Sequence, residues 1–173
     1  MGARPSHWLP RLVQHRLLDE RDARAKLSTA ALKRIEEHVA ASERGHDGEI
    51  RVCVEAGLPW SYIRRGASAR ERAVQMFGKL RVWDTERNDG VLVYLLLAEH
   101  AIEIVADRGL AARVPPEAFS ELASAMGADF RRGDFEAGLL RAVDAVGALL
   151  AQHFPVEAGR ANANELPDAP VFR

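Results

Sequence analysis

A single stretch decides the fold of this chain: Trp83–Leu110, which reads WDTERNDGVLVYLLLAEHAIEIVADRGL. It contains two short apolar runs rich in Val, Ile and Leu, residues 91–98 and 101–106, with only Glu99 and His100 between them. Apolar runs of this length that are bounded by turn residues are typical of strands buried on both faces. The small gap predicts a β-hairpin, although Glu-His is not a preferred pair for a tight turn.

A further strand is predicted at residues 49–55, where polar and apolar residues alternate, so that one face of this strand is expected to be covered. Between it and the hairpin, Ser68 and Glu71 form a capping-box pattern at the start of a helix. A strand, a helix and a strand at this spacing predict a right-handed crossover, which makes residues 49–55 parallel to residues 91–98. The sheet is therefore expected to be mixed, with a parallel crossover pair and a hairpin.

The remainder of the chain is predicted to be mainly helical. Apolar residues recur at helical spacing in residues 29–41, 116–132 and 134–154. We expect three parts, namely a helical N-terminal arm at residues 1–27, an α/β domain at residues 28–154 and an extended C-terminal tail at residues 155–173.

Composition narrows the class of protein. The chain has 173 residues, of which 47% are hydrophobic and 28% are charged, and its formal net charge is −1. This balance is ordinary for a globular domain and offers no basic surface that would favour nucleic acid. Cys53 is the single cysteine, which excludes an internal disulfide and is expected to be a small core residue. No run approaches the ~20 apolar residues of a membrane span, and no signal peptide is recognisable, so we expect a cytoplasmic protein without a transmembrane segment.

The predicted topology brings polar residues to one edge of the sheet. The start of the first hairpin strand lies beside the end of the second, so Asn88 and Asp89 are expected near Asp107. Parallel strands start at the same edge, so three further polar residues are expected there, His46, Asp47 and Glu49.

Oxygen-bearing side chains at this edge suit a hard cation such as Ca²⁺ or Mg²⁺. Two structural explanations fit the same residues, because Asp and Asn form turns before strands, and because Arg108 can pair with Asp89 or Asp107. The strong signatures of catalysis are absent from the sequence: it has no phosphate-binding glycine loop, no nucleophile elbow, no paired cysteines and no histidine pair at ligand spacing. Catalytic residues are therefore not assigned.

Several motifs in order along the chain resemble the TPM domain family. Asn88–Leu92 reads NDGVL and resembles the family's N-G-V-L start of a strand, while Ile102–Ile104 resembles its I-E return strand. Asp107–Leu110 reads DRGL and resembles the family's G-x-G-L/I ending, with the first glycine replaced. Phe130–Phe135 reads FRRGDF and resembles a later F-R-x-G-D-[FY] motif. The resemblance covers roughly residues 28–153 and is closest to a short bacterial branch of the family, without signal peptide or membrane anchor.

The resemblance implies a three-layer α/β/α sandwich, with a small mixed sheet that helices cover on both faces. It also implies divalent-cation binding, for which Asp89, Asp107 and neighbouring Asn88 are the candidate ligands. A plant thylakoid-lumen relative is linked to photosystem II repair and is described as an acid phosphatase, and an animal relative modulates a receptor. The family's function is otherwise unsettled.

Two hypotheses about function follow. The first is a divalent-cation-binding interaction module that acts with a membrane-associated protein partner, through the arm or the tail. The alternative is a metal-dependent phosphatase-like hydrolase, in which Asp89 and Asp107 hold Ca²⁺ or Mg²⁺ and Arg108 helps to bind phosphate. The interaction module is favoured because no nucleophile or general base can be recognised in the sequence. Whether the chain is an enzyme stays open.

Overall fold

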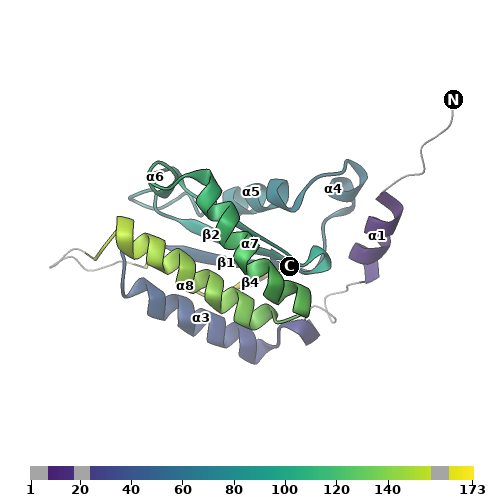
Figure 1. Cartoon of the computed structure of the whole chain (residues 1–173), viewed down its shortest axis with the longest axis horizontal. Coiled ribbons are helices and arrows are strands. Elements are labelled where there is room, and N and C mark those ends of the chain that lie inside the picture. Colours follow the sequence, from purple (N-terminus) through teal and green to yellow (C-terminus); the bar gives the residue numbers. More distant parts are fainter. Residues whose placement is uncertain (1–7, 18–23, 157–163) are drawn as a thin grey trace.

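The computed structural model describes residues 8–17, 24–156 and 164–173, and its centre is a four-stranded sheet with the order β3-β2-β1-β4 (Figure 1). The strands are β1 (Ile50–Glu55), β2 (Val91–Leu96), β3 (Ala101–Ala106) and β4 (Val171–Phe172). β1 runs parallel to β2, β2 runs antiparallel to β3, and β4 runs parallel to β1. The predicted crossover pair and the predicted hairpin are both confirmed.

Helices cover both faces of this sheet, as the prediction of a three-layer sandwich requires. In chain order the helices are α1 (Trp8–Leu17), α3 (Thr29–Glu43), α4 (Trp60–Arg64), α5 (Ala69–Lys79), the 3₁₀ turn η1 (Leu97–Glu99), α6 (Arg108–Ala111), α7 (Pro116–Arg132) and α8 (Phe135–His153). Figure 1 shows α3, α7 and α8 on one side of the sheet and α4 and α5 on the other.

Alternation along the strands builds a separate core on each face. Val91, Val93 and Leu95 of β2 pack with α3, α7 and α8, whereas Leu92 and Tyr94 pack with α4 and α5. All six residues of β2 are fully buried, which agrees with the prediction of a strand covered on both faces. The hairpin turns through η1 and through His100, which takes a left-handed conformation at φ 49°. This geometry explains how Glu-His closes the hairpin without a preferred turn pair.

The prediction that only one face of β1 is covered is wrong, because all six of its residues are buried. Its polar face lies under α5 and the C-terminal tail, and its charges have partners there. Arg51 donates to the carbonyl oxygen of Ala169 at 2.8 Å and to that of Pro167, and Glu55 pairs with Arg72 of α5. The alternation of polar and apolar residues predicted that the polar face of β1 is exposed to water. In the structure, buried hydrogen-bond and ion-pair partners replace water on that face.

The described parts of the arm and the tail both pack on the domain. In α1, Arg11 Nε donates to Glu99 Oε1 at 2.6 Å, and His15 Nδ1 accepts from the Leu58 N–H at 3.0 Å. The tail ends in β4, where the Arg173 N–H donates to the Val54 carbonyl oxygen at 2.9 Å. The tail therefore supplies an edge strand of the sheet.

Candidate cation site

The hairpin places the predicted site residues at one edge of the sheet. The Asp107 N–H donates to the Gly90 carbonyl oxygen, and the Gly109 N–H donates to the Asn88 carbonyl oxygen, both at 2.8 Å. Asn88 and Asp89 therefore lie alongside Asp107 and the start of α6, as the topology predicted. On the other side of β2, the Val91 N–H donates to the Glu49 carbonyl oxygen at 2.8 Å, which brings the start of β1 to the same edge.

Two glycines allow this close approach of backbones. A Cβ atom at Gly90 would overlap the carbonyl oxygen of Val82, and one at Gly109 would overlap the carbonyl oxygen of Asn88. Both neighbours are backbone atoms, which cannot turn away as a flexible side chain can. The two glycines of the motifs NDG and DRG are thus required by packing at this edge.

Asp89 is buried with its charge unsatisfied. Its side chain belongs to a residue that is 1% exposed, and neither carboxylate oxygen meets the geometry of a hydrogen bond within the part of the chain that the structure describes. Burial raises the pKa of Asp89 above its usual range, and the nearby Thr85 hydroxyl and the backbone oppose part of that rise. A buried carboxylate without partners is costly, so it needs an explanation.

Asp107 shares this feature at one of its two oxygens. Oδ1 accepts from the Arg108 N–H at 2.7 Å and caps α6, whereas Oδ2 is buried and has no hydrogen-bond partner among the described residues. Together with both oxygens of Asp89, this edge therefore buries three carboxylate oxygens that lack a donor.

Asn88 is placed differently from the two aspartates. Its Oδ1 accepts from Arg108 Nε at 2.7 Å, so a cation would have to displace Arg108 before it could use this oxygen. The side chain of Arg108 thus contacts the amide, and within the described ranges it donates to neither aspartate, so the salt-bridge explanation does not account for Asp89. Asn88 also takes a left-handed conformation at φ 55°, which asparagine tolerates better than most residues.

Further carboxyl groups surround this edge, among them Glu49, which was expected here from the sequence, and Glu43, which was not. Burial, with smaller contributions from the negative charges of Glu165 and Asp89, raises the pKa of Glu49 to about 7. Glu49 Oε2 accepts from the Leu166 N–H at 3.0 Å, which ties the tail to this edge. Burial raises the pKa of Glu43 to about 8, and Glu49 and Asp168 add to the rise.

The sequence does contain a signal for Glu43. It follows Ile35 and Val39 at intervals of four, on the face of α3 that packs against the sheet. Its Oε1 accepts from the Ile50 N–H at 2.8 Å, so it caps the start of β1. A carboxylate on an apolar stripe therefore indicates a buried charge.

His46 and Asp47 contribute less to the site. His46 is 1% exposed, with Nδ1 at 2.8 Å from the Gly48 carbonyl oxygen and Nε2 at 3.1 Å from Ser42 Oγ, and burial lowers its pKa. Asp47 forms an ion pair with Arg87. Among the described residues, no group of three or more His, Cys, Asp and Glu side chains is arranged to hold a metal ion. Any cation here would rely on two carboxylates together with water or backbone oxygens.

Comparison with known proteins identifies the family. A sequence model of the TPM domain matches residues 21–149, which is most of the chain. The chain belongs to the TPM domain family. The match starts within the segment that we assigned to the arm, and it includes Asn88, Asp89 and Asp107.

Solved structures of similar proteins agree with the fold. The chain is similar to the BA42 protein of the psychrophilic bacterium Bizionia argentinensis, with 25% identity, a TM-score of 0.73, and coverage of 85% of this chain and 95% of the other. The N-terminal domain of a protein from P. gingivalis has 22% identity and a TM-score of 0.58, with coverage of 76% and 82%, and supports the fold alone. No curated protein matches the chain. In the described residues, no helix has both the length and the apolar character needed to cross a membrane.

Proposed function

We propose that this TPM domain is an interaction module that binds a divalent cation, Ca²⁺ or Mg²⁺, at the edge that contains Asp89 and Asp107. One observation carries the proposal: both oxygens of Asp89 and Oδ2 of Asp107 are buried without a hydrogen-bond donor. A hard cation is the partner that such oxygens prefer, and it would offset the cost of burying these three oxygens.

Asp89, Asp107 and Asn88 would contribute different ligand atoms to such a site. Asp89 would provide the buried oxygens, while Asp107 would offer Oδ2 and keep Oδ1 on the N–H of Arg108. Asn88 would join only when Arg108 moves away from its amide oxygen. Arg108 therefore competes with the cation for one ligand, and removing its side chain should strengthen cation binding.

An NMR titration tests the proposal. Full-length ¹⁵N-labelled protein is titrated separately with CaCl₂ and MgCl₂, and we expect saturable amide shifts at residues 85–90 and 107–109 with at least one of the two ions. Asp89→Asn should abolish these shifts. Asp84→Asn is the matched control, because Asp84 lies on the same loop but is exposed and pairs with Arg81. The proposal fails if neither ion shifts these amides, or if Asp89→Asn titrates like the unmodified chain.

The partner of the module is proposed to be a membrane-associated protein. The described residues of the arm and the tail are engaged with their own domain, since Arg11 and His15 contact the 97–99 turn and Leu58, and Val171–Phe172 pairs with β1. A partner that uses either segment would have to displace it, so another exposed surface is the simpler docking site.

The hydrolase alternative is supported by one feature, the guanidinium of Arg108 next to the aspartates. A cation and a neighbouring guanidinium are groups that a phosphate ester would need. Turnover of p-nitrophenyl phosphate that requires the cation, is lost with chelator and is lost in Asp89→Asn would favour this alternative. Cation binding without turnover would favour the interaction module.

A further inference from the structure

The edge of the sheet formed by β3 has no neighbouring strand among the described residues. In the antiparallel pairing, Asp107 bonds to Gly90, and the same alternation directs the backbone of residues 101, 103 and 105 toward β2. The N–H and C=O groups of Ile102, Ile104 and Ala106 therefore point away from β2, and of these the Ile104 carbonyl oxygen is bonded to Arg70. Such an edge is a template for another strand.

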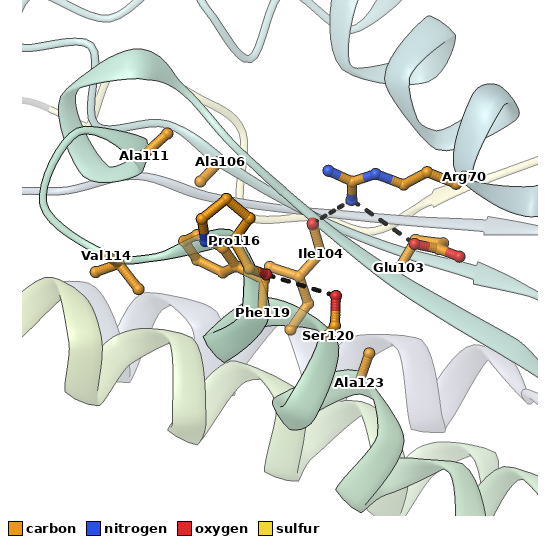
Figure 2. Close-up of a pocket in the computed structure, with 10 residues that line it drawn as sticks. All are labelled: Arg70, Glu103, Ile104, Ala106, Ala111, Val114, Pro116, Phe119, Ser120 and Ala123. Atoms are coloured by element: carbon orange, nitrogen blue, oxygen red, sulfur yellow. Dashed lines mark hydrogen bonds and ion pairs between the residues drawn. The ribbon is translucent and has the colours of Figure 1, made fainter.

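A cavity of about 490 Å³ lies beside this edge, between β3, the start of α5 and the first half of α7 (Figure 2). Val114, Phe119 and Ala123 form its apolar side. Figure 2 shows Arg70 reaching over the strand from the opposite side, where its guanidinium donates to the Ile104 carbonyl oxygen at 2.5 Å.

Arg70 covers this edge at Ile104. Its side chain is 51% exposed and also pairs with Glu103 at 3.7 Å. An incoming peptide N–H could take over the Ile104 carbonyl oxygen, and the displaced guanidinium would keep Glu103 and have donors left over. A carboxylate on the incoming peptide would accept from those donors.

We propose that the β3 edge binds an extended peptide as a fifth strand, and that the peptide has aliphatic residues alternating with acidic ones. The pattern follows from the pleat of the sheet. Ile104 faces the core with α7, whereas Glu103 lies on the side of Arg70, so a peptide residue opposite Ile104 would direct its side chain into the apolar cavity. Its two neighbours would lie on the side of Arg70 and Glu103, where an aspartate or glutamate would share the Arg70 guanidinium with Glu103.

This inference names the kind of partner for the proposed interaction module and rests on that part of the proposed function. It does not rest on the cation, because the surface is formed by β3, Arg70 and α7 and does not use Asp89 or Asp107. The two proposals can therefore fail separately.

The test uses the full chain and a fluorescein-labelled peptide, Ser-Asp-Ile-Asp-Ile-Asp-Ser, with binding followed by fluorescence anisotropy and by ¹⁵N amide shifts at residues 101–106. We expect saturable binding that is weakened about fivefold or more when the isoleucine nitrogens of the peptide are methylated, because backbone donors to β3 are lost. Replacing each peptide aspartate with lysine should weaken binding to the unmodified chain, and Arg70→Glu should reverse this preference. Both peptide changes leave the protein itself intact.

Two protein variants locate the contact. Ala106→Pro removes an N–H from the free edge and should weaken binding, whereas Ala106→Ser retains the N–H and should bind normally. Measurements repeated with EDTA and with Asp89→Asn should give the same peptide affinity. The proposal is overturned if methylated and unmethylated peptides bind equally, or if Arg70→Glu leaves the charge preference unchanged. It is also overturned if Ala106→Pro abolishes a dimer of the chain and leaves peptide binding intact, because a second copy would then be the occupant.

Discussion

The parallel pair of β1 and β2 buries carboxylates in different ways at its two ends. At the end of β1, Glu55 Oε2 accepts from Arg72 Nε at 2.8 Å and from the Tyr94 hydroxyl at 2.6 Å, and a second guanidinium nitrogen of Arg72 reaches Oε1. Beside the start of β1, Asp89 precedes β2 and is also buried, but its two oxygens have no donor in the described structure. One sheet thus contains a satisfied carboxylate at one end and an unsatisfied carboxylate at the other.

The difference separates a structural charge from a candidate functional one. A buried carboxylate with a bidentate arginine and a tyrosine hydroxyl has each oxygen occupied, so little is left for a ligand. A buried carboxylate without donors has lost its water and gained no partner, so its desolvation lowers the stability of the fold unless a cation binds. Two further carboxyl groups at the same end, Glu43 and Glu49, are also costly to ionise, because burial raises their pKa values.

The largest expected effect comes from breaking the satisfied end. Arg72→Met keeps an apolar stem but leaves Glu55 with only the Tyr94 hydroxyl, and we expect the free energy of unfolding to fall by about 3–5 kcal/mol. Urea unfolding followed by circular dichroism measures the change. The control is Arg132→Met, because Arg132 pairs with Asp129 while its own side chain is 61% exposed, and this variant should lose less than about 1 kcal/mol. Equal losses of stability in the two variants would show that the buried pair of Arg72 and Glu55 stabilises the fold no more than an exposed pair.

A smaller effect is expected from pH at the unsatisfied end. Glu43 and Glu49 have pKa values of about 8 and about 7 in the folded chain, above the ordinary value of 4.5. Between pH 4.5 and the raised pKa values, the folded state binds more protons than the unfolded state. The stabilisation by the two protonated glutamates is therefore fully present below pH ~4.5 and is lost as the pH rises through 7 to 8. We expect the free energy of unfolding to fall between pH 5 and pH 9.

Variants assign this pH dependence to the two glutamates. The double variant Glu43→Gln/Glu49→Gln should flatten the dependence between pH 5 and pH 9, measured by urea unfolding at several pH values. Glu71→Gln is the control, because interactions with Arg65 and with the Ser68 N–H lower the pKa of Glu71, so that it titrates below this range. An unchanged slope in the double variant would locate the dependence elsewhere.

The contrast between the two ends also shows what the sequence can predict. The two apolar runs of Trp83–Leu110 and the capping box at Ser68 determine β2, β3 and α5 through local rules, so the sandwich and the approach of Asp89 to Asp107 followed from the topology. β4 was not predicted, because Val171–Phe172 is two residues long and gains its stability from pairing with β1.

The state of each charge could not be predicted in the same way. Glu55 meets Arg72 and Tyr94 across 17 and 39 residues of sequence, so no local pattern reveals that pair. Arg108 was a possible partner of Asp89 in the sequence, but its side chain donates to Asn88 in the structure. Topology therefore predicted which backbone segments lie side by side, and tertiary packing decided which charges find partners.

The smallest expected effect removes the unsatisfied charge itself. Asp89→Asn keeps the shape of the side chain but not its negative charge, so without divalent cation the free energy of unfolding should rise by about 1 kcal/mol at pH 7. Because burial raises the pKa of Asp89, the gain should shrink as the pH falls below the ordinary range of an aspartate, where both states of the chain carry the proton. Asp84→Asn should change stability little, because Asp84 is exposed.

Added cation should reverse the order of stability of Asp89→Asn and the unmodified chain. A cation that binds only the folded chain stabilises it by about 1.4 kcal/mol at ten times its Kd, and Asp89→Asn would not receive that gain. The unmodified chain should therefore be less stable than Asp89→Asn in EDTA and more stable than Asp89→Asn in excess Ca²⁺ or Mg²⁺, measured by urea unfolding in each buffer. If Asp89→Asn is destabilised in EDTA, then the carboxylate is satisfied in solution, and the two ends of the β1–β2 pair are alike after all.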